Sequence, residues 1–162
     1  MTRARFADTL QLLAGHNVEF IVVGMTAGIL QGVPLTTIDV DILHRRTPAN
    51  VEKLLGALTQ MQAQYRHDPR KLSPTASHLI GPGNHLLSTS YGDLDCLGTI
   101  GNNQTYDDLL NDSVTITLAS GKELRVLSLP RLIEMKRQAG RPKDIAALPH
   151  LEATLDELLR RG

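Results

Sequence analysis

The sequence predicts a mixed α/β (α+β) fold, in which a mixed β-sheet is flanked by helices. Val18 to Val23 is a nearly continuous apolar, β-branched run, which is typical of a buried strand. Ile38 to Leu43 alternates apolar and acidic residues, the period of a strand whose two faces differ. Leu54, Leu55 and Leu58 recur at helical spacing within the segment between these strands and the next. Both periods in one short chain favour an α/β architecture.

The remaining elements follow from the same two periods and from turn residues. Strands are expected over residues 18–23, 38–43, 85–88, 94–97, 113–118 and 123–127. Helices are expected over residues 3–14, 26–31, 51–61, 106–110 and 128–138, with two further short helices over 142–148 and 151–161. The polar stretch 65–84 receives no assignment. We expect one domain over residues 1–162, with a core at about 18–127 and a helical tail at about 128–161.

Composition excludes several classes of protein. The 162 residues are 41% apolar and 21% charged, as in ordinary globular proteins. No apolar run is long enough to span a membrane, and no signal-peptide pattern opens the chain, so we expect a cytoplasmic protein. The single cysteine, Cys96, agrees with a reducing compartment and is expected to be a small apolar strand residue. Seventeen basic residues balance seventeen acidic ones, although residues 125–143 carry a local basic excess.

Paired aspartates in the strand 38–43 are the first chemical signal. Asp39 and Asp41 stand two residues apart, so both side chains face the same side of the sheet about 7 Å apart. Two carboxylates so close to an apolar layer repel each other and favour a bound cation. Oxygen ligands of this kind suit Mg²⁺, which usually also binds substrate phosphates. The alternative is a sheet with one solvated face, but aspartate is depleted in strands.

A second acidic strand strengthens the metal hypothesis. Residues 91–97 again alternate carboxylates with apolar residues, so Asp93 or Asp95 can complete a three-carboxylate cluster if this strand lies beside the first. Such a cluster can hold two metal ions about 4 Å apart. Asp95 is preferred because Leu94 and Cys96 flank it, whereas Asp93 is expected to point to solvent near the strand start.

A glycine at a strand-to-helix turn supplies the other half of the predicted site. Gly24 follows the first buried strand and has no side chain, so backbone N–H groups there can approach a phosphate. Lys136 lies on the predicted helix 128–138 beside apolar neighbours, where it either faces a ligand or is a solvated residue.

Together these motifs resemble the DNA polymerase β-like nucleotidyltransferase superfamily. The resemblance covers about residues 18–148: a strand ending in Gly24, a short helix, Thr37-Ile38-Asp39-Val40-Asp41, and a later strand with one more aspartate. The segment Lys136-Arg137-Gln138-Ala139-Gly140-Arg141-Pro142-Lys143-Asp144 is similar to one that follows the core in small bacterial, toxin–antitoxin-associated (AbiEii/MNT-like) members.

The resemblance implies an Mg²⁺-dependent enzyme that transfers an NMP from a nucleoside triphosphate (NTP) to an acceptor, with RNA, a protein or a small molecule as the acceptor. It implies that Asp39, Asp41 and Asp95 bind the metal, and that Gly24 and Lys136 contact the phosphates. The usual Gly-Gly or Gly-Ser turn is replaced by Gly24-Met25. The backbone N–H of Met25 is still expected to bind the phosphates, and the hydroxyl of Thr26 is the candidate substitute for the lost side-chain ligand.

Two rival hypotheses remain at the level of sequence. Met25, and the lack of a separate acceptor-binding domain, suggest a decayed nucleotidyltransferase fold that acts as a nucleotide-binding protein or as an antitoxin with a small partner protein. A plain structural α/β domain is the third reading, and it requires that the three aspartates lie apart in space.

Overall fold

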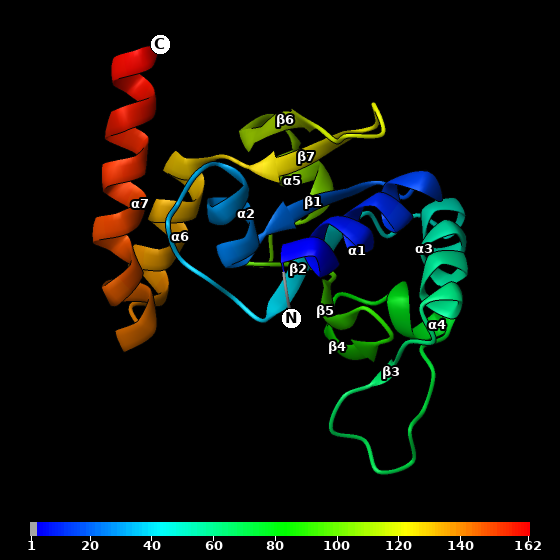
Figure 1. Cartoon of the computed structure of the whole chain (residues 1–162). Helices are drawn as coiled ribbons and strands as arrows, with labels where there is room; N and C mark the ends of the chain where they lie inside the picture. Colours follow the sequence, from blue (N-terminus) through cyan, green and yellow to red (C-terminus); the bar gives the residue numbers. More distant parts are fainter. Residues whose placement is uncertain (1–2) are drawn as a thin grey trace.

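The computed structural model describes residues 3–162, with side chains from Phe6 onward. Its centre is a seven-stranded mixed sheet with the strand order β3-β4-β5-β2-β1-β7-β6 (Figure 1). The strands are β1 (Phe20–Val23), β2 (Asp39–His44), β3 (Gln64–Tyr65), β4 (Asn84–Thr89), β5 (Gly92–Leu97), β6 (Ser113–Thr117) and β7 (Glu123–Leu127). The helices are α1 (Arg3–Gly15), α2 (Gly24–Leu30), α3 (Pro48–Gln60), α4 (Ala76–Leu79), α5 (Tyr106–Leu109), α6 (Leu129–Ala139) and α7 (Pro142–Arg161), with a 3₁₀ turn at Leu110–Asp112.

Strand β2 lies in the middle of the sheet and is antiparallel to β1 but parallel to β5. On one side, β1 pairs in parallel with β7, which forms an antiparallel hairpin with β6. On the other side, β4 and β3 continue from β5 as antiparallel strands. The predicted mixed sheet flanked by helices is confirmed, and so is the predicted hairpin within 113–127.

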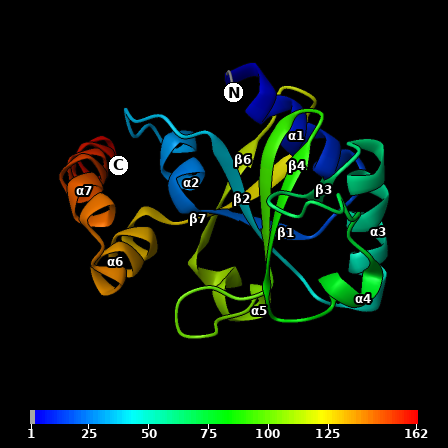
Figure 2. The ribbon, with the colours of Figure 1, turned by 90° about the horizontal axis from the view of Figure 1, so that it is seen from below.

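Helices cover both faces of the sheet. Helices α1, α3 and α4 lie on one side, whereas α2, α6 and α7 lie on the other (Figure 2). Apolar strand residues such as Ile21, Ile42 and Leu94 are fully buried between these layers. Cys96 is fully buried as well, which confirms its prediction as an apolar strand residue.

The helices of the C-terminal tail are positioned by their ends. Ser128 caps α6 and accepts a hydrogen bond from the backbone N–H of Arg131 at 3.4 Å, as expected for a serine before a helix. Gly140 ends α6 in the left-handed conformation, with φ of 64°. Because α7 begins only two residues later, at Pro142, the end of α6 and the start of α7 lie close together.

One continuous helix, α7, replaces the two short helices expected over 142–148 and 151–161. Pro149 lies inside it and removes a single backbone hydrogen bond, because proline has no N–H. Ala147 and Leu151, on either side of this proline, are buried against the body of the protein. Their packing holds the helical path through the proline.

The unassigned segment 65–84 contains little regular structure. Strand β3 is only two residues long, and α4 is a single turn whose N-terminus is capped by Thr75 and His78. The loop between them projects from the lower part of the molecule in Figure 1. Within residues 3–162, no helix combines the length and the apolar character needed to cross a membrane.

Candidate functional site

Four carboxylates gather on one face of the central strands. The parallel register of β2 and β5 pairs Asp39 with Asp93 and Asp41 with Asp95. Paired residues in a sheet point to the same side, and so do residues two apart along a strand. The structure therefore brings Asp39, Asp41 and Asp95 together, and the reading that requires them to lie apart is wrong. Asp93 shares this face rather than pointing away, and its side chain is 34% exposed against 14% for Asp95.

A guanidinium that sequence reasoning missed lies among these carboxylates. Arg66 follows β3, and its Nη1 lies 2.9 Å from Asp93 Oδ2 and 3.5 Å from Asp39 Oδ1. Its Nη2 donates to Asp95 Oδ1. Among the side chains that the structure describes, no group of three or more His, Cys, Asp or Glu residues is arranged to hold a metal ion. Arg66 supplies the positive charge at this point of the site.

Burial and mutual repulsion raise the pKa values of the central carboxyls. The pKa of Asp41 is raised to about 7, first by burial and then by the neighbouring Asp95 and Asp39, while Lys136 opposes the shift. Burial and Asp95 likewise raise the pKa of Asp39, against the opposing effect of Arg66. These groups carry more negative charge than the surrounding cations neutralise.

The oxygen chemistry of the cluster fits a divalent cation, although its described side chains are arranged around Arg66 rather than around a metal ion. Asp39 Oδ1 is buried and has no hydrogen-bond partner, although Arg66 lies within ion-pair distance. Oxygen-only ligands from adjacent strands match the preference of Mg²⁺. A divalent cation would also remove the repulsion that holds a proton on Asp41 near neutral pH.

Gly24 packs directly against this cluster. It begins α2 with φ of 63°, a left-handed conformation that glycine adopts without strain. A Cβ at this position would overlap Asp41 Oδ2, so a larger residue would displace the carboxylate. The predicted glycine at the turn thus has a steric reason that the sequence did not reveal.

The two residues after Gly24 differ from expectation. Thr26 is buried, with 1% of its surface exposed, and its hydroxyl donates to the carbonyl of Asp39 at 2.9 Å. The idea that this hydroxyl substitutes for a lost phosphate ligand is corrected: it fixes the start of β2 instead. The Met25 side chain is half-buried and packs against the core.

A basic cluster, formed by Lys136 and Arg141 around Asp144, lies across a cavity from Asp41. The carboxylate of Asp144 has no exposed surface and binds Lys136 Nζ at 3.0 Å and Arg141 Nε at 2.6 Å. Hydrogen bonds from these two cations outweigh the effect of burial and lower the pKa of Asp144 to about 2. Asp144 also accepts from the backbone N–H of Arg141 and so caps α7. Lys136 is 17% exposed, so it is not a freely solvated residue.

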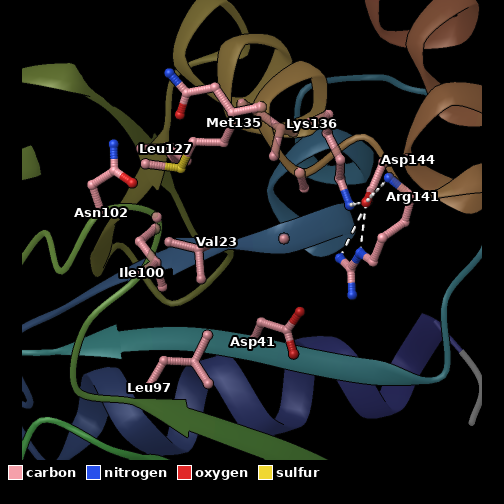
Figure 3. A pocket seen from close by; sticks show the side chains of 15 residues that line it. Val23, Asp41, Leu97, Ile100, Asn102, Leu127, Met135, Lys136, Arg141 and Asp144 are labelled. Carbon is pink, nitrogen blue, oxygen red and sulfur yellow. Dashed lines mark hydrogen bonds and ion pairs between the residues drawn. The ribbon is translucent and has the colours of Figure 1, made fainter.

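Asp41, from the carboxylate cluster, and the basic cluster face each other across a cavity of about 380 Å³. Figure 3 shows Asp41 on one side and Lys136, Arg141 and Asp144 on the other, with dashed lines marking the contacts of Asp144. The wall between them is largely apolar and includes Val23, Leu97, Ile100, Leu127, Leu132 and Met135. Gly24 also lines the cavity, but Met25 is not part of the wall. A volume of this size is typical of a small-molecule site.

Two solved structures share this arrangement of elements. TM1012 from Thermotoga maritima, assigned as a nucleotidyltransferase, matches with a TM-score of 0.59 and 18% identity over 100% of this chain and 97% of its own. The lincosamide antibiotic adenylyltransferase LnuA, with lincomycin bound, matches with a TM-score of 0.64 and 15% identity over 95% of this chain and 98% of its own.

The chain has the nucleotidyltransferase fold. No protein-family model matches the sequence, and no curated protein matches it significantly. The fold agrees with the superfamily that the motifs resemble, while the toxin–antitoxin-associated branch rests on those motifs alone.

Proposed function

We propose that this protein is an Mg²⁺-dependent nucleotidyltransferase, which moves an NMP from an NTP to an acceptor hydroxyl and releases pyrophosphate. One observation carries the proposal: a single cavity has Asp41, a member of the carboxylate cluster, on one side and a Lys136–Arg141 pair on the other. A metal–triphosphate complex has this distribution of charge, with a divalent cation next to phosphate oxygens.

In this proposal, Asp39, Asp41 and Asp95 hold the metal. When bound, Mg²⁺ neutralises the charge that develops on the phosphates and polarises the attacking oxygen. Lys136 and Arg141 bind the triphosphate from the other wall, held in place by the buried Asp144. The backbone at Gly24, free of any side chain, leaves room for the phosphates beside Asp41.

The transfer balances as a substitution at the α-phosphorus. The acceptor oxygen forms a bond to this phosphorus, and the bond to the oxygen that bridges to the β-phosphate breaks. Pyrophosphate leaves with that oxygen, and the proton of the acceptor hydroxyl passes to a carboxylate of the cluster. Positioning of the two reactants and stabilisation of charge supply the rate enhancement.

One of the two structural neighbours bears on the class of acceptor. LnuA is an adenylyltransferase of lincosamide antibiotics, and it covers nearly the whole of this chain. This similarity favours a small hydroxyl-bearing acceptor over RNA or a protein for the present chain.

A second function is favoured by the surface of α7. Three apolar side chains on this helix are exposed, namely Ile145, Leu158 and Leu159, with Leu159 at 70%. Such positions suit contact with a helical partner. The alternative is thus a nucleotide-binding or antitoxin-like protein within a toxin–antitoxin system. Met25, one of the two features that suggest a decayed site, is not among the residues that line the cavity.

Metal-dependent consumption of ATP, CTP, GTP and UTP tests the two functions. We expect turnover of at least one NTP by the wild type and a loss of at least about 10³-fold in Asp39→Asn and Asp41→Asn. Asp156→Asn, an exposed aspartate on α7, is the matched control and should keep full activity. Copurification with a small helical protein, with no NTP consumption, would support the second function.

A further inference from the structure

The carboxylate cluster already contains a cation of its own. Arg66 contacts three carboxylates, from Asp39, Asp93 and Asp95, and its side chain is only 15% exposed. The Arg66 guanidinium lies within ion-pair distance of Oδ1 of Asp39 and donates to Oδ1 of Asp95, and both residues belong to the proposed metal-binding set. It therefore engages two of the three carboxylates that the proposed function assigns to a metal ion.

The guanidinium and a divalent cation compete for these oxygens. Mg²⁺ binds its ligands at about 2.0–2.1 Å and demands a nearly fixed octahedral geometry. An oxygen that accepts a hydrogen bond from Arg66 and also coordinates Mg²⁺ would place the two cations only about 4 Å apart, where they repel each other. Binding of the metal to Asp95 and Asp39 thus requires that Arg66 withdraw.

The structure allows the side chain to withdraw while the backbone stays in place. The N–H of Arg66 donates to the carbonyl of Leu86 at 2.9 Å, and that of Tyr65 donates to the carbonyl of Leu72 at 2.8 Å. The Tyr65 hydroxyl is also hydrogen-bonded to His85 Nδ1 at 2.9 Å. Arg66 borders a hollow of about 580 Å³, formed by residues 65–70 with Asn84 and Leu86, which can receive the displaced guanidinium.

We propose that Arg66 is a built-in counter-ion, which neutralises the cluster when no metal is bound and which a divalent cation must displace. This inference rests on the proposed function, because it concerns the same metal site. The inference predicts the direction in which metal affinity changes when Arg66 is replaced. Removing a residue that supports the site weakens metal binding, whereas removing a competing cation strengthens it.

The test is a calorimetric titration of Mg²⁺ and Mn²⁺, without nucleotide, into the wild type, Arg66→Gln and Arg66→Lys. We expect the dissociation constant to fall by at least about tenfold in Arg66→Gln, because one like charge is removed from within hydrogen-bond distance. Arg66→Lys should lie between the two, since a single ammonium cannot contact all three carboxylates. It also keeps the positive charge that the fold needs if Arg66→Gln proves unstable.

Arg70→Gln is the matched control. Arg70 lies four residues further along the same loop, is 74% exposed and pairs with Asp68 rather than with the cluster. Its removal should leave the dissociation constant of the metal unchanged, which separates the local effect of Arg66 from a general loss of positive charge.

Unchanged or weaker metal binding in both Arg66 variants would overturn the inference. If the wild type binds the metal with the same affinity as these variants, the proposed function survives and only the role of Arg66 fails. If neither the wild type nor any variant binds Mg²⁺ or Mn²⁺, both the inference and the proposed function fail. Tight binding by Arg66→Gln alone would support Arg66 as the group that limits metal binding.

Discussion

The two sides of the cavity carry opposite imbalances of charge. On the sheet side, Asp41 lines the cavity, and the three carboxylates beside it share one guanidinium, that of Arg66. On the helical side, one carboxylate, Asp144, is shared by two cations, Lys136 and Arg141. The first wall has an excess of negative charge and the second an excess of positive charge.

The difference appears in the pKa values. That of Asp41 is raised to about 7, whereas that of Asp144 is lowered to about 2. A structural ion pair has no need of such an imbalance, because matched charges satisfy each other. The surplus on each wall is consistent with the proposed ligand, which carries both a cation and phosphates.

The largest expected effect is an opposite response of the two walls to pH. Because the pKa of Asp41 is raised to about 7, this residue lowers the stability of the metal-free protein as pH rises from about 4 to about 7, by up to about 4 kcal/mol. Because the pKa of Asp144 is depressed to about 2, this residue stabilises the folded protein above about pH 4. About 2 kcal/mol of this stability is lost as pH falls from about 4 to about 2.

Urea unfolding between pH 2.5 and pH 8 measures both slopes. Asp41→Asn should remove the loss of stability above pH 4, and Asp144→Asn should destabilise the protein at pH 7 and remove the loss at low pH. The comparison breaks if both variants are destabilised equally at pH 7 or if neither slope changes. Mg²⁺ at pH 8 should restore stability in the wild type, since it replaces the proton on Asp41.

A smaller effect is expected on NTP affinity when neighbouring cations of α6 are replaced one at a time. Lys136→Gln removes a cation that faces the cavity, so the affinity for NTP should fall by about 10–100-fold. Arg137→Gln on the next position removes an exposed cation that pairs with Glu152, and it should leave the affinity unchanged. Fluorescence titration with a labelled ATP analogue measures both. Equal losses in the two variants would mean that only the net charge of the helix matters.

Much of the fold and the carboxylate site could be predicted because both depend on local periodicity. Alternation placed Asp39 and Asp41 on one face, and a second alternating strand supplied Asp95. The place of Gly24 at a strand end was also visible, but its contact with Asp41 was not, because that contact depends on the pairing of β1 with β2.

The parts that sequence reasoning missed depend on long-range contacts. Arg66 reaches the site only because the two-residue strand β3 pairs with β4, and nothing in the polar segment 65–84 signals this. The Thr26 hydroxyl donates a hydrogen bond to the carbonyl of Asp39, thirteen residues further along the chain. The course of α7 through Pro149 is decided by packing rather than by local propensity, which a proline opposes.

The central claim is that the carboxylate wall and the basic wall together bind a metal–nucleotide complex. It is tested most directly by calorimetric titration of each NTP into the wild type and Asp39→Asn, with and without Mg²⁺. We predict that at least one NTP binds the wild type only when Mg²⁺ is present, and that Asp39→Asn loses this binding. Absence of binding at millimolar NTP, or equal binding by Asp39→Asn, would contradict the claim.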